Sequence, residues 1–185
     1  MSAGNRQPDE RPGEAHIESD GAGPAGAARD DHKQSISLVI RNWARPEQLL
    51  LVQRPHDDDS LPGVWGLPAA TLRLDESWAD AGRRIGPEKL GVTLHMGREL
   101  NRGGRMQRGH TMEMRLFEAT ILRGLPSVPQ NAGGVTQYRQ WRWDAAEALR
   151  PGALQGSLCC MLQLDLMARE ARVRAKMRER DGSPA

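Results

Sequence analysis

The segment of residues 65–92 constrains the fold more than any other part of the chain. Its residues 75–77, Asp-Glu-Ser, are typical of a helix start, because acidic side chains are favoured near the positive end of the helix dipole. Apolar side chains then recur on one helical face, at Trp78, Ala81 and Ile85. Gly91 is a natural helix terminator. The segment therefore predicts an amphipathic helix with acidic side chains at its start.

Gly86 and Pro87 interrupt this helical pattern. Proline lacks an amide donor and disfavours helical geometry in the residue before it. Two alternatives stay open. Either a kinked helix continues to Leu90, or a first helix ends near Ile85 and Pro87 begins a short second one.

Two apolar runs before this segment predict β-strands. Residues 35–40 (SISLVI) have large apolar side chains at alternate positions, which is the period of a strand. Residues 48–54 (QLLLVQR) form a continuous apolar run, typical of a central strand that is covered on both faces. A turn at residues 44–47 separates the two runs. We therefore expect them to form a hairpin.

The chain after the helix alternates between strand and loop patterns. Strands are expected at residues 92–100, 111–122 and 138–143, and a flexible basic loop at residues 103–109 (GGRMQRG). From Ser157 onward, leucine and methionine recur at helical spacing. This pattern predicts a helix that packs on the core and ends in solvated basic turns. Its alternative is a nucleic-acid or membrane contact.

Length and composition fit a single domain with tails. A chain of 185 residues with 38% hydrophobic residues can bury one ordinary core. Residues 1–34 contain four basic and seven acidic side chains and almost no large apolar ones, so we expect a disordered acidic tail. The ordered domain is expected over residues 35–168. Residues 169–185 are expected to form a basic helix end and a tail.

Charge and apolar content limit the classes of partner. A net charge of +2 gives no argument for nucleic acid, which we do not expect as a partner. The N-terminus lacks the apolar core of a signal peptide, and no run approaches the roughly 18 apolar residues of a membrane span. A cytoplasmic protein without a membrane partner is expected. The adjacent Cys159 and Cys160 predict buried free thiols, because a zinc site needs spaced ligands.

Residues 70–92 also carry charged side chains at a fixed spacing. Glu76, Arg84 and Glu88 follow Ala70 at intervals of six, eight and four positions, and Gly91 is followed by an apolar residue. This spacing resembles the box of the Nudix hydrolases: Gly, five residues, Glu, seven residues, then Arg-Glu-apolar-x-Glu-Glu-x-Gly-apolar. The runs LLLVQRP, VWGLPAA and YRQWRW are similar to family segments outside the box. The resemblance implies an α+β fold with a mixed β-sheet between helices, an α/β/α arrangement.

The resemblance also implies a metal site. In that family the box presents carboxylates to Mg²⁺ or Mn²⁺, which polarises a diphosphate and the attacking water. The three helical carboxylate positions correspond here to Ile85, Glu88 and Lys89, so one acid is kept and the lysine repels a nearby metal. We therefore expect Mg²⁺ or Mn²⁺ to be bound weakly or to be absent. Its expected ligands are Glu88 and the backbone carbonyl of Ala69.

The activity that the resemblance implies is hydrolysis. Glu88 is expected to carry catalysis, while Glu76 and Arg84 complete the candidate catalytic set as a scaffold ion pair. The substrate would be a nucleoside diphosphate derivative, whose diphosphate linkage is cleaved by water with the help of Mg²⁺. The site would bind this metal ion more weakly than a typical Nudix hydrolase does. The alternative is a non-catalytic Nudix-fold module that binds a nucleotide or a protein partner. Many Nudix domains form dimers, so a homodimer is a further option.

Further candidates lie outside the box. Glu113 and Glu118 are candidates for a replacement carboxylate from a neighbouring strand. Four arginines are candidates for phosphate contacts, because guanidinium groups match phosphate oxygens: Arg54, Arg105, Arg108 and Arg115. Arg54 is the strongest, since it ends a strand that borders the family's substrate cleft. Trp65 and Trp78 are expected in the core rather than stacked on a base.

Overall fold

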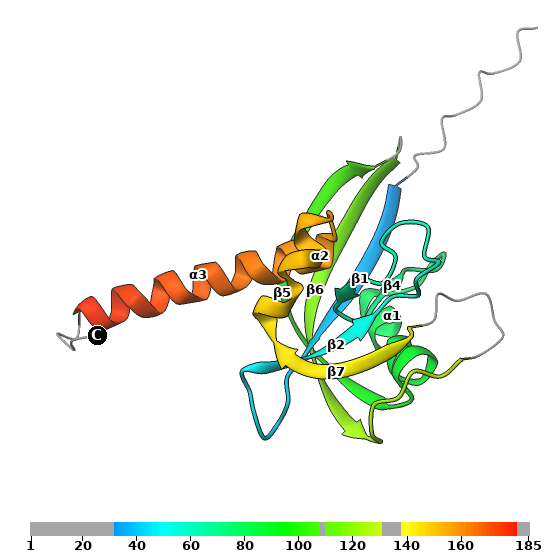
Figure 1. The fold of residues 1–185 in the computed structure, drawn as a ribbon, viewed down its shortest axis with the longest axis horizontal. Coiled ribbons are helices and arrows are strands. Elements are labelled where there is room, and N and C mark those ends of the chain that lie inside the picture. Colours follow the sequence, from blue (N-terminus) through cyan, green and yellow to red (C-terminus); the bar gives the residue numbers. More distant parts are fainter. Residues whose placement is uncertain (1–31, 108–109, 131–137, 181–185) are drawn as a thin grey trace, which may run out of the picture.

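The structure is a computed structural model that describes residues 32–107, 110–130 and 138–180 (Figure 1). In chain order its elements are β1 (His32–Ile40), β2 (Gln48–Gln53), β3 (Trp65–Gly66), β4 (Ala69–Thr71), α1 (Trp78–Ile85), the π-helical turn η1 (Gly86–Leu90), β5 (Thr93–Gln107), β6 (His110–Arg123), β7 (Gln140–Ala145), the 3₁₀ turn η2 (Ala146–Leu149), α2 (Arg150–Leu154) and α3 (Leu158–Arg180). Of the predicted tail, residues 1–34, positions 1–31 lie outside the described residues. β1 begins at His32 rather than Ser35, because the backbone of His32 pairs with Thr111.

The strands form two sheets. One is four-stranded in the order β4-β1-β6-β5, and the other is three-stranded in the order β3-β2-β7. β1 and β6 run parallel, and the other described strand pairs are antiparallel. This combination confirms the expected mixed β-structure.

Alternate residues of the two central strands face two different cores. Ile36 and Leu50 pack with Ile85 and other residues of α1 and η1. Val39 and Leu49 pack instead with residues of η2 and α3. Burying one such side chain stabilises the fold by about 1.5–3 kcal/mol. Helices therefore cover both faces, with α1 and η1 on one side and η2, α2 and α3 on the other, which confirms the α/β/α arrangement (Figure 1).

Both tryptophans near the box pack at the edges of these cores. Trp78 lies against the first core and stacks on Phe117, with ring centroids 6.4 Å apart. Trp65 lies against the second core, and the Arg142 guanidinium is 4.0 Å from its ring centroid. Both rings are thus occupied by protein contacts, as predicted.

The predicted hairpin between residues 35–40 and 48–54 is wrong. β1 and β2 belong to different sheets, and the described backbone pairing between these segments is one bridge, from Arg41 to Leu49. β2 already has β3 on one edge and β7 on the other. β3 pairs only with Val52 and Gln53, so the bridge uses the rest of that edge of β2. β1 does not extend this pairing because β4 and β6 occupy its own two edges.

The predicted flexible loop at residues 103–109 is wrong as far as Gln107. β5 continues through it, and Gly103 pairs with Met114 while Gly104 pairs with Glu113. A Cβ at Gly104 would lie 2.9 Å from the Met112 carbonyl oxygen. Glycine at this position therefore allows the two strands to approach closely. The sequence pattern alone cannot distinguish this role from that of a flexible loop. Residues 108 and 109 lie outside the described part of the chain.

The helix that carries Glu88 continues past Pro87 as a π-helical turn. α1 ends at Ile85, as one of the two alternatives predicted, and η1 follows it directly. Gly86 permits this turn, because a Cβ there would lie 2.6 Å from the Val92 carbonyl oxygen. Gly91 ends it with φ 64°, in the left-handed region. A π-helical turn holds more residues than an α-helical turn, so it changes the direction of the side chains that follow Ile85.

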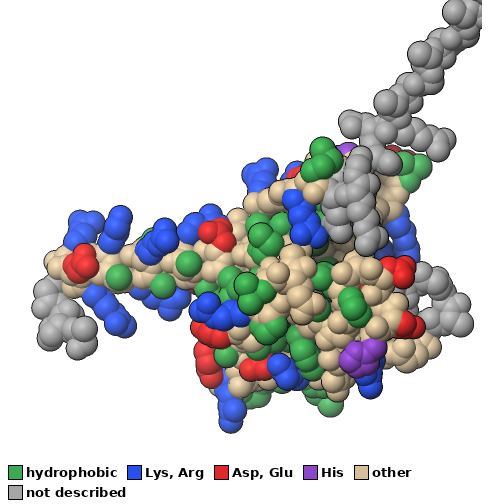
Figure 2. Space-filling view, turned by 45° about the horizontal axis from the view of Figure 1, so that its top comes forward, with side chains coloured by type: hydrophobic (Ala, Val, Ile, Leu, Met, Phe, Trp, Pro, Cys, Tyr) green, Lys and Arg blue, Asp and Glu red, His purple; other side chains and the backbone are tan. Residues whose placement is uncertain are grey.

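The C-terminal helix α3 begins in the core and ends in solvent. Leu158, Cys159, Cys160 and Leu162 are buried, and both cysteines are free, as predicted. Residues 171–180 are exposed, and this end of α3 stands out from the body with Lys and Arg side chains around it (Figure 2). The basic turns of α3 therefore lie outside the core. Within the described ranges, no helix has the length and apolar character needed to cross a membrane.

Candidate functional site

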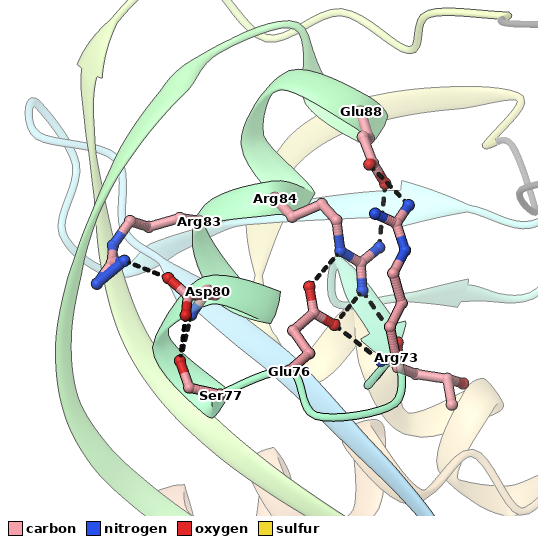
Figure 3. Close-up of polar contacts among 8 residues, drawn as sticks. Arg73, Glu76, Ser77, Asp80, Arg83, Arg84 and Glu88 are labelled. Atoms are coloured by element: carbon pink, nitrogen blue, oxygen red, sulfur yellow. Dashed lines mark hydrogen bonds and ion pairs between the residues drawn. The ribbon is translucent and has the colours of Figure 1, made fainter.

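Glu76 and Arg84 form a two-point ion pair beside the start of α1 (Figure 3). Arg84 Nε donates to Glu76 Oε1 at 2.6 Å, and Arg84 Nη2 donates to Oε2 at 2.7 Å. Oε2 also accepts from the backbone N–H of Arg73 at 2.9 Å, which ties down the loop before the helix. Hydrogen bonds from Arg84 lower the pKa of Glu76 despite its partial burial. The pair therefore anchors the loop to the helix.

The start of α1 is fixed by a local cap. Ser77 has extended backbone geometry, and its hydroxyl accepts from the backbone N–H of Asp80 at 3.2 Å. The helix begins at Trp78, as the acidic cluster predicts. From the helix that begins at this cap, Arg84 points back toward Glu76 (Figure 3).

Both carboxylate oxygens of Glu88 are bonded to arginines. Oε1 accepts from Arg73 Nη2 at 2.9 Å, and Oε2 accepts from Arg84 Nη1 at 3.0 Å (Figure 3). Partial burial opposes ionisation, but the two guanidinium groups outweigh it and hold the pKa of Glu88 below its ordinary value. The three predicted catalytic-set residues, Glu76, Arg84 and Glu88, therefore belong to one network.

Lys89 points to the backbone of β4. Its Nζ donates to the Ala69 carbonyl oxygen at 2.8 Å and lies 5.3 Å from the centroid of the Tyr138 ring. The residue is only 7% exposed. Burial, helped by the positive charges of Arg54 and Arg84, lowers the pKa of Lys89 to about 8. The ammonium form still predominates at neutral pH.

The Ala69 carbonyl oxygen has a second hydrogen-bond donor. The Tyr138 hydroxyl donates to it at 3.1 Å and accepts from the Ala69 N–H at 2.8 Å. A carbonyl oxygen has two lone pairs, and here Lys89 and Tyr138 occupy them. Burial of the hydroxyl raises the pKa of Tyr138 to about 12, so it stays a donor at neutral pH.

The residues that the resemblance assigns to a divalent cation do not fit one in this arrangement. Ile85 is fully buried in the first core, and the Glu88 oxygens are held by arginines. In the described ranges, no group of three or more His, Cys, Asp or Glu is placed to hold a metal ion. An ammonium about 4 Å from a divalent ion opposes it by about 8 kcal/mol at an effective dielectric constant of about 20. Ligation by Glu88 stays a prediction, in which the carboxylate would share its oxygens between the ion and the two arginines.

A small cavity lies beside Lys89 and Ala69. Its volume is about 130 Å³. Three cationic side chains line it, Lys33, Arg54 and Lys89, together with the polar residues Ser35, Thr71 and Tyr138. Its described lining contains no carboxylate. The cavity is therefore positively charged, and it includes the arginine that the sequence favoured for phosphate contact.

Arg54 is oriented by Asp58. Its Nη1 lies 2.9 Å from one carboxylate oxygen of Asp58 and 3.2 Å from the other. Asp58 in turn accepts from the backbone N–H groups of Ser60 and Leu61. Burial opposes ionisation of Asp58, but these bonds and Arg54 lower its pKa. The loop after β2 thus holds the guanidinium at the cavity.

The other candidates do not join the site. Glu113 accepts from Arg115 at 2.8 Å and from Gln34 at 3.1 Å, and Glu118 packs beside Gly97. Arg115 lies over the Trp78 ring, 4.3 Å from its centroid. Neither glutamate contacts Glu88 within the described residues, and neither Arg105 nor Arg115 lines the cavity. Arg108 lies outside the described residues.

Sequence reasoning missed Tyr138 and Arg73. Tyr138 is the chain's single tyrosine and precedes β7. Nothing in the sequence singles it out as a site residue, because its hydrogen-bond partner Ala69 is known only from the structure. Arg73 lies close to Glu76 in sequence, but its side chain reaches Glu88 across the loop. Lys89 was recognised as unfavourable to a metal, but its bond to Ala69 depends on the π-helical turn.

Comparisons with known proteins agree with this fold. No protein-family model and no curated protein sequence matches the chain. The MutT protein from Methanosarcina mazei Go1 is similar with a TM-score of 0.58 and 17% identity, over 80% of this chain and 99% of that one. A Nudix hydrolase from Nitrosomonas europaea has a TM-score of 0.57 and 16% identity, over 75% and 88%. A C. elegans Ap4A hydrolase binary complex has a TM-score of 0.54 and 17% identity, over 78% and 98%.

At 16–17% identity the structural likeness shows the fold alone, and the activity has to be argued from the residues of the site. The three likenesses cover 75–80% of this chain, with TM-scores of 0.54 to 0.58. The chain is therefore a Nudix-fold protein.

Proposed function

We propose that the protein binds the phosphate groups of a nucleotide-type small molecule in the cavity beside β1, β4 and η1. The observation that carries this proposal is the charge of the lining: Lys33, Arg54 and Lys89 are present, and no described carboxylate is. Clustered cations in a partly closed site attract an anion with several negative charges. Arg54 adds planar geometry, because a guanidinium donates to two phosphate oxygens at once.

The nucleotide class is supported by the similar structures. One is an Ap4A hydrolase and another is a UDP-X diphosphatase, which has a TM-score of 0.51 and 15% identity. Both names describe those proteins, and both name nucleotide compounds. For this chain they favour a nucleotide-type ligand over other phosphorylated molecules.

Hydrolysis of a diphosphate linkage is the second candidate. The observation that favours it is the network of Glu76, Arg84 and Glu88. These three residues match the box pattern, and Arg84 forms an ion pair with each of the two glutamates. In such a reaction Lys89 and Arg54 would stabilise the negative charge that develops on the phosphate oxygens. Catalysis by Glu88, use of Mg²⁺ or Mn²⁺, and a homodimer remain predictions attached to this candidate.

Titration calorimetry with a panel of nucleoside diphosphates and triphosphates tests the proposal. We expect at least one class to bind, and Arg54→Gln to weaken that binding about tenfold or more, because a hydrogen bond to a charged group is lost. Arg172→Gln, on the exposed end of α3, is the matched control and should bind like the wild type. Failure of every panel member to bind would refute the proposal.

Phosphate release by the same panel separates the two candidates. The hydrolase candidate predicts release that is lost in Glu88→Gln. Binding without release, with or without Mg²⁺ or Mn²⁺, would contradict it and would leave the binding module as the function.

A further inference from the structure

We propose that the Lys89 ammonium takes the place of a divalent cation at the Ala69 carbonyl, so that the cavity binds phosphate without a metal ion. The proposal rests on the phosphate binding argued above. It adds that the positive charge next to the phosphate is supplied by the Lys89 side chain and not by a bound metal ion. A protein built this way recognises its ligand at any concentration of divalent metal.

The first argument is the position of the charge. Lys89 Nζ lies 2.8 Å from the Ala69 carbonyl oxygen, which is the backbone ligand that the box resemblance assigns to a metal. The Tyr138 hydroxyl fills the other lone pair of that oxygen at 3.1 Å. A metal can reach this oxygen only by displacing one of these two donors.

The second argument is that Lys89 is buried without an acidic partner. It is 7% exposed, and the salt bridges of the described residues do not include it. The adjacent Glu88 is bonded instead to Arg73 and Arg84. Lysine is seldom buried this far unless it is paired, because an isolated buried charge is destabilising. An anion in the cavity supplies the missing counter-charge.

The third argument is access. Lys89 lines the cavity, and an ammonium group has three N–H donors, of which one is bonded to Ala69. The cavity volume of about 130 Å³ is many times the roughly 10–15 Å³ that one water molecule requires, so a phosphate group has room. Lys33 and Arg54 provide further positive charge on the same lining. The remaining donors of Lys89 therefore have a phosphate-sized space beside them.

Calorimetric titration of the full chain with inorganic pyrophosphate tests the anion half of the proposal. We expect wild-type protein to bind pyrophosphate in EDTA, with no tighter binding when Mg²⁺ replaces EDTA. Lys89→Gln keeps a donor for the Ala69 carbonyl but removes the charge, and should weaken binding about tenfold or more. Lys176→Gln, on the exposed end of α3, is the matched control and should not. Wild-type binding that appears only with Mg²⁺ would overturn the proposal.

Thermal unfolding with Mn²⁺ alone tests the metal half. A ligand that binds the folded state raises the unfolding temperature. We expect Mn²⁺ to leave the wild type and Lys176→Glu unchanged and to stabilise Lys89→Glu, in which a carboxylate replaces the ammonium. Lys89→Met, which has neither the charge nor a donor for the Ala69 carbonyl, provides a neutral variant if Lys89→Glu does not fold, and should also be stabilised, by a smaller amount. Equal stabilisation of the wild type and the Lys89 variants would refute the replacement of the metal.

The two measurements fail separately. If pyrophosphate binds in neither EDTA nor Mg²⁺, the proposed function is wrong and phosphate binding at Lys89 falls with it. Stabilisation by Mn²⁺ that is confined to the Lys89 variants would still show that this ammonium excludes a metal. If pyrophosphate binds in EDTA but Lys89→Gln binds it as the wild type does, phosphate binding stands and the role of Lys89 is refuted.

Discussion

The guanidinium of Arg84 holds both carboxylate oxygens of Glu76, at 2.6 Å and 2.7 Å. Only 13% of the arginine side chain and 11% of the glutamate side chain are exposed. Two short parallel bonds with little solvent make this one of the stronger kinds of ion pair. This ion pair fixes the loop before α1 against α1, and η1 with Glu88 and Lys89 follows that helix directly.

Glu76→Gln should therefore destabilise the protein. The substitution removes the charge and at least one of the two bonds, and we expect a loss of about 1–3 kcal/mol in the free energy of unfolding. Urea denaturation measures it. Glu170→Gln breaks an exposed pair with Arg174 and should cost about 0–1 kcal/mol. Equal effects of the two substitutions would show that the Glu76 pair is no stronger than a surface pair.

The same pair predicts a pH dependence. Hydrogen bonds from Arg84 lower the pKa of Glu76, so folding favours its ionised form. The stabilisation is complete above the unfolded-state pKa of about 4.3 and is lost as pH falls through the lower folded-state pKa. The difference in unfolding free energy between wild type and Glu76→Gln should be constant above about pH 5 and shrink below about pH 4. A difference that grows on acidification would contradict the account.

Gly86→Ala tests the π-helical turn. A Cβ at Gly86 would lie 2.6 Å from the Val92 carbonyl oxygen and 3.0 Å from Leu94 Cγ, so the turn must shift. We expect a loss of about 1–3 kcal/mol, the usual effect of overpacking. The control is Gly66→Ala, whose Cβ would meet its nearest atom, Cys159 Sγ, at an ordinary 3.6 Å. If Gly86→Ala is no more destabilising than Gly66→Ala, the chain does not need glycine at this point.

The sequence predicted the elements better than their pairing. Alternation in residues 35–40 and the apolar run in residues 48–54 correctly indicated strands, because side-chain periodicity depends on local burial. Which edges pair depends on distant segments, and the hairpin prediction failed because β4 and β6 occupy the two edges of β1. The glycines of β5 were misread for a related reason, since a tight strand contact and a flexible loop both select glycine.

The candidate site was predicted in part for the same physical reasons. Glu76, Arg84 and Glu88 are in contact, because the loop before α1, α1 itself and η1 follow one another directly in the chain. The direction of Lys89 depends on the π-helical turn, and its partner Tyr138 comes from a segment far along the chain. No pattern in residues 70–92 contains that information.

Ile85→Glu shows why the lost carboxylates are not equivalent. Ile85 is fully buried in the first core, so a glutamate there is left without a partner. We expect a loss of about 3 kcal/mol or more by urea denaturation, and no Mn²⁺ binding. The matched comparison is Lys89→Glu, whose side chain borders the cavity. Wild-type stability with Mn²⁺ binding in Ile85→Glu would show that position 85 faces the cavity instead.

The central claim, that Lys89 occupies the position of a metal at Ala69, is tested most directly by a crystal structure after soaking in Mn²⁺. Anomalous scattering locates the ion. We predict Lys89 Nζ at hydrogen-bond distance from the Ala69 carbonyl oxygen, with no Mn²⁺ peak in contact with that oxygen. A peak about 2.0–2.6 Å from the Ala69 carbonyl oxygen, with Lys89 turned away and Glu88 released from its arginines, would contradict the claim.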